Sequence, residues 1–289
     1  MKLIAAQTLS LSNPVSTSKN HNFSALINAL GQPQHRTENH ALWEDVQLSR
    51  AQLQPLANDC QADFSLVPQE RRLSDFKFAA FDMDSTLINI ECIDEIADYV
   101  GKKAQVAAIT EAAMRGEISD YSESLRQRVA LLKGLPESAL DTVYRERLQL
   151  NPGVENLIEG LHKASIKTLV VSGGFTFFTE RLKHRLGLDF AHSNQLEIIN
   201  GVLTGQLVGR IVDAQVKQNT VSEYCQQIGC TAAQTIAVGD GANDLKMMAI
   251  CGVSVAYRAK PVVQAQASCA INYTGLDTVL SWLSGELIR

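Results

Sequence analysis

The sequence predicts an α/β protein in which a sheet of parallel strands carries an inserted helical cap and follows a small N-terminal α/β domain. Three observations lead to this class. From Phe76 onward, short apolar runs alternate with helical segments, as in parallel sheets with helices on both faces. The first two runs are separated by about 80 residues, far more than an ordinary crossover needs. Residues 1–75 differ in composition, because they are rich in Asn, Gln, Ser and His.

Signs of folded structure lie within residues 1–75. The tetrapeptide at residues 49–52, Ser-Arg-Ala-Gln, fits a capping box that opens a short helix. Apolar stretches at residues 42–48 and 64–67 are expected to be strands. We therefore expect a small α/β domain here, joined to the rest of the chain by a linker over residues 68–75.

Four later apolar runs are expected to be the parallel strands, at residues 77–81, 167–171, 235–238 and 253–256. The first three deliver Asp82, Ser172 and Asp240 at their carboxyl ends, the edge at which open α/β sheets bind ligands. Polar groups from three separate motifs should therefore meet at one edge of the sheet.

The segment between the first two strands is predicted to be helical, with helices at residues 91–99, 103–115, 122–133 and 136–149. Such a segment, at about residues 91–150, would cover the edge of the sheet as a cap. Further along the chain, Asn200 and Gly201 stand between alternating apolar residues and predict a β-hairpin over residues 196–208.

Composition narrows the functional classes. With 289 residues, 45% of them apolar, the chain can bury a sizeable core, yet no apolar run is long enough to cross a bilayer. The opening residues turn polar too soon for a signal peptide, so we expect a cytoplasmic protein that does not act at a membrane. The net charge of −5 and the dispersed Lys and Arg residues give no support to nucleic-acid binding. Six cysteines without C-x-x-C spacing predict reduced, mostly buried thiols rather than disulfides or a zinc site.

The main chemical signal is Phe81-Asp82-Met83-Asp84-Ser85-Thr86, directly after the first strand. Two carboxylates two residues apart on a turn can reach one site, while Ser85 and Thr86 are expected to start the next helix. One carboxylate can attack phosphorus, and the other can donate a proton to the leaving oxygen. The alternative is that Asp84 or Ser85 only caps a helix.

A second acidic motif, Gly239-Asp240-Gly241-Ala242-Asn243-Asp244, follows another apolar run. Beside Asp82, its side chains would form a cluster of carboxylates that repel one another unless a cation is present. Oxygen ligands of this kind suit Mg²⁺, which needs only one or two carboxylates together with a substrate phosphate. The alternative is a glycine-rich turn with an Asn or Asp cap.

Two further features fit an anionic substrate. Val171-Ser172-Gly173-Gly174-Phe175-Thr176 passes from a strand into a helix, so that a hydroxyl and backbone N–H groups are available to cradle a phosphate. Lys217 offers a point cation that would neutralise phosphate charge. The alternatives are a tight strand-to-helix turn and a solvated surface lysine.

These four motifs, in this order, resemble the haloacid-dehalogenase-like superfamily, which has a Rossmann-like sheet. The continuation of the first motif to Ile96, the cap stretches at 113–117 and 124–129, and the other motifs are similar to the phosphoserine phosphatase family in particular. The resemblance spans about residues 76–265. It implies hydrolysis of L-phosphoserine to L-serine and phosphate, the last step of serine biosynthesis, through an aspartyl phosphate and with Mg²⁺ as cofactor.

The resemblance also implies how the chemistry is divided. Asp82 would be the nucleophile, and Asp84 the general acid and base. The metal would be bound by Asp82, by the backbone carbonyl of Asp84 and by Asp240, with Asp244 behind these ligands.

Substrate binding is implied for two further sets of residues. The phosphoryl oxygens would be held by Ser172, the N–H of Gly173 and Lys217, with Asn243 nearby. In the cap, Glu91 and Arg128 would bind the amino and carboxylate ends of the substrate, although they also fit a first-turn helix acid and a surface helix residue. Met114 and Tyr121 would line the apolar side of the pocket. Here the sequence departs from the family, which commonly has Phe where Tyr121 stands.

Other functions stay open at this point. A dehalogenase needs no acid two residues after the nucleophile, so Asp84 argues against it. A phosphotransferase, or a phosphatase acting on other small phosphomonoesters, would use the same residues. A binding or regulatory protein with an inert core is disfavoured by the intact catalytic set. The first 75 residues are compatible with a short relative of the amino-acid-sensing ACT domains, and the sequence permits a homodimer.

Overall fold

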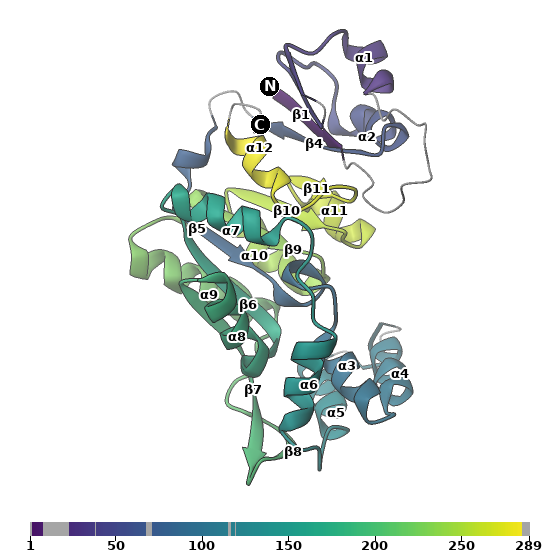
Figure 1. The fold of residues 1–289 in the computed structure, drawn as a ribbon, viewed down its shortest axis with the longest axis vertical. Coiled ribbons are helices and arrows are strands. Elements are labelled where there is room, and N and C mark those ends of the chain that lie inside the picture. Colours follow the sequence, from purple (N-terminus) through teal and green to yellow (C-terminus); the bar gives the residue numbers. More distant parts are fainter. Residues whose placement is uncertain are drawn as a thin grey trace.

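The computed structural model describes residues 2–7, 23–37, 39–67, 71–114, 117–118 and 120–284. In this part of the chain a single sheet of 11 strands runs through the molecule, in the order β2-β3-β1-β4-β11-β10-β9-β5-β6-β7-β8 (Figure 1). None of the described helices is long and apolar enough to cross a membrane.

The parallel part of the sheet consists of β5 (Phe78–Phe81), β6 (Lys167–Phe175), β7 (Phe190–Ile199), β9 (Thr235–Gly239), β10 (Val253–Tyr257) and β11 (Cys269–Ile271). Four of these strands are the apolar runs predicted from the sequence. Alternate side chains of β5 enter opposite cores: Ala79 and Phe81 join one apolar cluster, and Phe78 and Ala80 join the other. The predicted parallel sheet with two buried faces is therefore confirmed.

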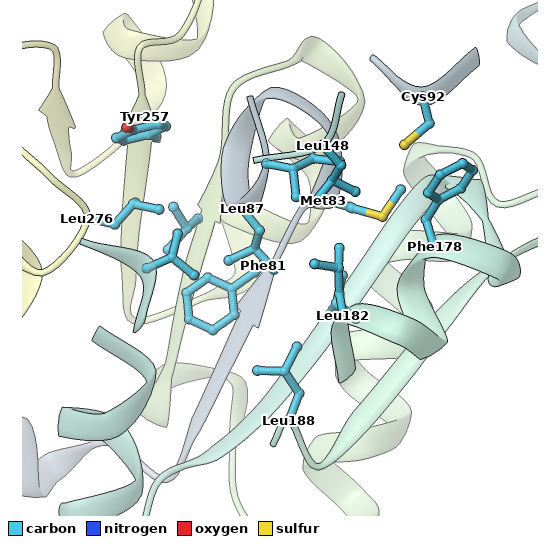
Figure 2. Close-up of a cluster of buried hydrophobic side chains, with 14 of the residues drawn as sticks. Phe81, Met83, Leu87, Cys92, Leu148, Phe178, Leu182, Leu188, Tyr257 and Leu276 are labelled. Carbon is cyan, nitrogen blue, oxygen red and sulfur yellow. The ribbon is translucent and has the colours of Figure 1, made fainter. Parts of the chain in front are cut away.

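Helices cover both faces of this sheet, namely α7 (Val154–Lys163), α8 (Thr176–Leu186), α9 (Ala214–Ile228), α10 (Leu245–Ile250), α11 (Pro261–Gln266) and α12 (Thr278–Ser284). Figure 2 shows one core, in which Phe81 of β5 lies near Leu87 of the turn that follows this strand and Leu182 of α8. Met83 of the same turn and Phe178 of α8 lie next to each other in the same cluster. This packing fixes the carboxyl end of β5, where the first acidic motif begins. All six cysteines are free thiols, and four of them are buried.

Four of the described α-helices lie between the turn that follows β5 and helix α7, and in Figure 1 they lie together beside the carboxyl edge of the sheet. They are α3 (Cys92–Tyr99), α4 (Lys103–Met114), α5 (Tyr121–Ala130) and α6 (Ser138–Glu146). Their bounds differ from the predicted ones mainly at the ends, as at residues 131–133 and 147–149, which are not helical. The two chain segments that enter and leave this helical insertion pair at Ile88 and Leu150.

The predicted hairpin is formed by β7 and β8 (Val202–Val208), with Asn200 and Gly201 both at positive φ in its turn. However, β7 begins at Phe190, six positions before the predicted start at 196, because its first half pairs with β6 in the main sheet. A contact with a distant strand decides where β7 begins, and no local pattern marks it.

The N-terminal elements are β1 (Lys2–Gln7), α1 (Ser24–Leu30), β2 (His35–Arg36), β3 (His40–Trp43), α2 (Arg50–Asp59) and β4 (Ala62–Val67). The backbone N–H of Ser49 donates to Gln52 Oε1 at 2.9 Å, as the capping box predicts. The strand expected over residues 42–48 is wrong beyond Trp43, because the chain turns at Asp45, which has a φ of 54°.

Strand β4 joins the N-terminal elements to the main sheet, because it pairs antiparallel with β11. Of the linker expected over residues 68–75, residues 68–70 lie outside the described part. Within the remainder, Leu73–Asp75 forms a short 3₁₀ helix.

Candidate active site

The carboxyl ends of β9, β5 and β6 lie side by side and bring Asp240, Asp82 and Ser172 together, as the sequence predicts. They open into a pocket of about 660 Å³ between the sheet and the helical insertion. Among the predicted site residues, those that line it are Asp82, Asp84, Glu91, Tyr121, Arg128, Ser172, Gly173, Asp240 and Asn243. The side chain of Met114 lies outside the described residues, so its predicted place in this pocket is untested.

The turn after β5 holds the two aspartates of the first motif. Asp82 Oδ1 accepts a hydrogen bond from the N–H of Met83 at 2.8 Å, and Asp84 Oδ1 accepts one from the N–H of Cys92 at 3.0 Å. Ser85 has a φ of 57°, in the left-handed region, so the chain leaves the turn without starting a regular α-helix. Ser85 and Thr86 lie within a short, irregular π-helical turn over Met83–Leu87, and the next α-helix, α3, begins only at Cys92. The expectation that these two residues open a regular helix is therefore wrong.

A distant side chain supports this turn. Asn151, at the end of the segment that leaves the helical insertion, is 8% exposed. Its Nδ2 donates to the carbonyl oxygens of Thr86 at 2.8 Å and Ile88 at 2.9 Å. A buried amide that satisfies two carbonyls holds the turn in one conformation. Sequence reasoning missed Asn151, because nothing near it in the sequence points to the turn it supports.

Lys217 lies beneath the pocket and is fully buried. Its Nζ is 2.7 Å from Asp82 Oδ1 and 2.7 Å from Asp244 Oδ1. Helix α9 places it there, because Asp213 caps the helix by accepting from the N–H of Val216 at 2.8 Å. Burial by itself lowers the pKa of Lys217, but the carboxylates of Asp244 and Asp82 raise it above its ordinary value. The alternative of a solvated surface lysine is excluded.

Asp82, Asp240 and Asp244 offer carboxylate oxygens that lie within 4.8 Å of one another. Burial raises the pKa of Asp240 to about 7, and the neighbouring Asp244 adds to the shift. Burial and Asp244 also raise the pKa of Asp82, although Lys217 opposes this. The cluster is therefore short of positive charge, and a cation bound between the carboxylates would keep them ionised.

The members of this cluster differ in how their oxygens are used. Asp244 Oδ1 accepts from Lys217, and its Oδ2 accepts from the N–H of Gly241 at 3.0 Å. Asp240 Oδ1 accepts from the hydroxyl of Thr86 at 2.9 Å. Both oxygens of Asp244 are thus engaged by the protein, which fits the predicted place of Asp244 behind the metal ligands. Thr86 belonged to the first motif, but sequence reasoning gave it no part in the site.

Ser172 and the two glycines after it line the same pocket, on the strand next to β5. Ser172 is 1% exposed, and its Oγ accepts from the N–H of Gly174 at 2.8 Å. A Cβ atom on Gly174 would stand 2.6 Å from Asp84 Oδ2, and one on Gly173 would collide with the hydroxyl of Tyr121. The absence of a Cβ atom therefore lets the chain lie this close to Asp84 at Gly174 and to Tyr121 at Gly173. Helix α8 begins at Thr176, as predicted.

Two groups of opposite charge face the same pocket from the helical insertion. Glu91 precedes α3, and its Oε1 accepts from the hydroxyl of Ser85 at 2.7 Å. Burial raises the pKa of Glu91, while Ser85 and Arg128 oppose the shift. Arg128, on α5, lines the pocket together with Tyr121 at the start of the same helix. The site thus combines an acid and a base on the helical insertion with carboxylates, a hydroxyl and a buried lysine at the edge of the sheet.

Comparison with known proteins agrees with this arrangement. The family model of haloacid dehalogenase-like hydrolases matches residues 79–249. The phosphoserine phosphatase of Polaromonas sp. is 60% identical over 220 residues, which are 75% of this chain and 93% of that protein. The chain belongs to the phosphoserine phosphatase family of these hydrolases.

Solved structures extend the likeness to the fold of this phosphatase-family member. A crystal structure of a haloacid dehalogenase family hydrolase from Salmonella enterica serovar Typhi has a TM-score of 0.85 at 32% identity, and the match covers 99% of each chain. A substrate-bound phosphoserine phosphatase complex has a TM-score of 0.67 at 36% identity and covers 72% of this chain and 99% of that chain. The likeness to the first of these structures includes the N-terminal strands, because it covers almost the whole chain.

Proposed function

We propose that this chain hydrolyses L-phosphoserine to L-serine and inorganic phosphate through a phospho-aspartate on Asp82, the last step of serine biosynthesis. One observation carries the proposal: Glu91 and Arg128 line the same pocket as Asp82 and Asp84. The ammonium and the carboxylate of phosphoserine match Glu91 and Arg128. Its phosphate matches the groups at the edge of the sheet. The names of the relatives support the same substrate.

In the proposed reaction, Asp82 attacks phosphorus in line with the departing serine oxygen. Lys217 and the hydroxyl of Ser172 neutralise charge on the phosphoryl oxygens. Burial, followed by the charge of Glu91, raises the pKa of Asp84 to about 7, which suits a group that both gives and takes a proton. Asp84 therefore protonates the serine oxygen and later takes a proton from the water that hydrolyses the aspartyl phosphate.

The carboxylate cluster fits Mg²⁺ as the cofactor of this reaction. Asp82 and Asp240 would be its side-chain ligands, the backbone carbonyl of Asp84 would be a third, and Asp244 would keep its bonds to Lys217 and Gly241. Bound Mg²⁺ supplies positive charge that neutralises the carboxylates and the phosphate together.

Substrate choice should come from the helical insertion, because hydrolysis of the phosphate needs only groups at the edge of the sheet. Arg128 can bind a carboxylate through two parallel N–H bonds, and Glu91 can bind an ammonium. A substrate that lacks one of these groups leaves a charge unpaired, which costs about 2–5 kcal/mol when the pair is desolvated. Met114 and Tyr121 would form the apolar side of the same pocket.

The test is phosphate release from a panel of phosphomonoesters with Mg²⁺ present. We expect phosphoserine to be hydrolysed with a much higher kcat/KM than phosphoethanolamine, which lacks the carboxylate, or 3-phosphoglycerate, which lacks the amine. Arg128→Ala should narrow the gap between phosphoserine and phosphoethanolamine. Arg126→Ala is the matched control, because Arg126 lies on the same helix with 59% of its side chain exposed. Similar kcat/KM values for all three substrates would contradict the roles of Glu91 and Arg128 and would support only a general phosphomonoesterase activity.

A phosphotransferase that passes the phosphoryl group to an alcohol is the second candidate, since it would use the same residues. Product analysis with and without added alcohol separates the two, because transfer yields a new phosphomonoester in place of part of the phosphate.

We also propose that residues 1–75 form a small N-terminal domain, related to amino-acid-sensing ACT domains, and that residues 76–289 form the catalytic part with its helical cap. The match of the hydrolase family model supports this division, because it begins at residue 79. A chain that starts at Leu73 should then remain catalytic in the phosphate-release assay, and an insoluble or inactive product would contradict the division. A cytoplasmic location and a homodimer remain predictions from the sequence.

A further inference from the structure

Asn194 lies on β7 and is 2% exposed. Its amide joins two segments of the site that are far apart in the sequence. Nδ2 donates to the carbonyl oxygen of Gly173 at 2.7 Å, and Oδ1 accepts from the N–H of Val212 at 2.8 Å. Asn194 lies outside the motifs that the sequence singled out, and the reaction described above does not use it.

The chemistry of the two partners fixes the orientation of this amide. A backbone carbonyl can only accept, and a backbone N–H can only donate, so Nδ2 must face Gly173 and Oδ1 must face Val212. The position therefore needs one donor and one acceptor on a short side chain. Asp lacks the donor, and Leu lacks both groups.

On one side, the bond from Asn194 sets the position of the Ser172 hydroxyl. The peptide that joins Gly173 to Gly174 is planar and trans, so its C=O and N–H point in opposite directions. With the C=O held by Asn194, the N–H of Gly174 is directed to Ser172 Oγ, which accepts it at 2.8 Å. The hydroxyl proton of Ser172 then remains available for a phosphoryl oxygen.

On the other side, Asn194 holds the entry to α9. Val212 directly precedes Asp213, the residue that caps this helix, and the N–H of Lys217 donates to the carbonyl of Asp213 at 2.9 Å. Movement of Val212 would therefore shift the first turn of α9 and the ammonium of Lys217 with it.

We propose that Asn194 is a positioning residue, which holds the Ser172 hydroxyl and the Lys217 ammonium where both can contact the phosphoryl group. The proposal rests on the proposed function, because it assumes that the pocket binds phosphate. Because Asn194 would position the groups that bind the phosphate end of the substrate, its substitution should lower kcat/KM by the same factor for every phosphomonoester. Substitutions in the helical insertion, by contrast, should change the preference among substrates.

The experiment compares Asn194→Asp and Asn194→Leu in the full chain. The Asp variant keeps the acceptor for Val212 but sets a carboxylate against the carbonyl of Gly173. If the Leu variant, which loses both buried hydrogen bonds, does not fold, the Asp variant alone still tests the proposal. Thr179→Val is the matched control, because Thr179 is 1% exposed and its hydroxyl is 2.7 Å from that of Ser193, the neighbour of Asn194 on β7.

Binding of inorganic phosphate is measured by calorimetry with Mg²⁺ present, and kcat/KM is measured with phosphoserine and phosphoethanolamine. We expect Asn194→Asp to weaken phosphate binding about tenfold, the effect of losing well-placed hydrogen bonds to a charged group. Misplacement of groups by about 1 Å lowers rates by about 10²-fold, so kcat/KM should fall to that extent for both substrates alike. Thr179→Val should lower Tm yet leave phosphate binding and both kcat/KM values within twofold of the wild type.

A folded Asn194→Asp protein with wild-type phosphate affinity and wild-type kcat/KM would overturn the proposal. A loss confined to phosphoserine would overturn it as well, because that result places Asn194 with the specificity groups. If the wild type releases no phosphate from phosphoserine but Asn194→Asp still weakens phosphate binding, the proposed function fails and the positioning role stands.

Discussion

The ammonium of Lys217 lies 2.7 Å from Asp82 Oδ1, and both side chains are buried at the bottom of the pocket. The same ammonium contacts Asp244, so removal of one acid does not leave Lys217 without a counter-charge. Because Lys217 has two acidic partners, the effect of substituting Asp82 on turnover can be distinguished from its effect on folding. Substitution of Asp82 should affect turnover far more than stability, because Asp244 still pairs with the cation.

Asp82→Asn tests the covalent step. The amide keeps the shape of the carboxylate but lacks its charge and its nucleophilicity, so steady-state turnover should fall by at least about 10³-fold. Tm and the circular dichroism spectrum should stay close to those of the wild type. Substantial turnover in a preparation whose substitution is verified by mass spectrometry would refute attack by Asp82.

Asp84→Asn tests the proton transfer. The amide cannot protonate the leaving serine oxygen, so hydrolysis of phosphoserine should drop by about 10²–10⁴-fold. An aryl phosphate such as p-nitrophenyl phosphate has a leaving group that needs no proton, so its first half-reaction should recover in part, measured as a burst of p-nitrophenol. An equal loss for both substrates would count against the acid role.

Removal of divalent metal should abolish activity, because the carboxylate cluster and a phosphate dianion repel each other without a shared cation. Excess chelator should stop phosphate release, and added Mg²⁺ should restore it. Ca²⁺ should restore it poorly, since it accepts more ligands at longer distances. Asp240→Asn provides a comparison, for which we expect a higher Mg²⁺ concentration at half-maximal activity. Full activity in excess chelator would contradict the metal site.

Asp63 ties the N-terminal elements to the catalytic sheet. Its Oδ2 accepts from the N–H of Thr274 at 2.7 Å and from the hydroxyl of Thr274 at 2.8 Å, and its Oδ1 accepts from the N–H of Asn272 at 2.7 Å. Asp63→Ala leaves these buried donors unpaired, so the free energy of unfolding should fall by about 3 kcal/mol. Chemical denaturation measures the loss, and Asp59→Ala, at an exposed site in α2, is the control. Because Asp63 lies outside the pocket, kcat/KM should change less than twofold.

His40 should make stability depend on pH. Burial lowers its pKa, although Asp277 opposes this, and its Nε2 lies 3.2 Å from the hydroxyl of Ser281 on α12. A lowered pKa in the folded state means that the unfolded chain binds the proton more tightly. Neutral His40 therefore contributes to the free energy of unfolding at pH values above the pKa of the unfolded chain, about 6.5. This contribution is lost as the pH falls through the lower pKa that His40 has in the folded protein.

Denaturation midpoints at pH 7.5 and pH 5 check this expectation. His40→Asn should reduce the difference between the two midpoints, whereas His35→Asn, at an exposed position on β2, should leave it unchanged. An identical pH dependence in wild type and His40→Asn would contradict the prediction.

The sequence by itself determined the parallel sheet and the convergence of its motifs. A buried strand appears as a short run of apolar residues, and the residue that follows it must lie at the carboxyl edge. For this reason Asp82, Ser172 and Asp240 were predictable as neighbours. The sequence also offered Lys217 as a cation, and the family resemblance then added Glu91 and Arg128. All three lie in or directly beneath the pocket.

Only the tertiary structure decided the contacts that join distant segments. Asp63 and Thr274 are 211 residues apart, and Asn151 is 65 residues from the carbonyl of Thr86 that it binds. Asn194 reaches both Gly173 and Val212 in the same way. Each of these side chains satisfies buried backbone groups, which is a requirement of the folded interior and leaves no periodicity or local spacing in the sequence.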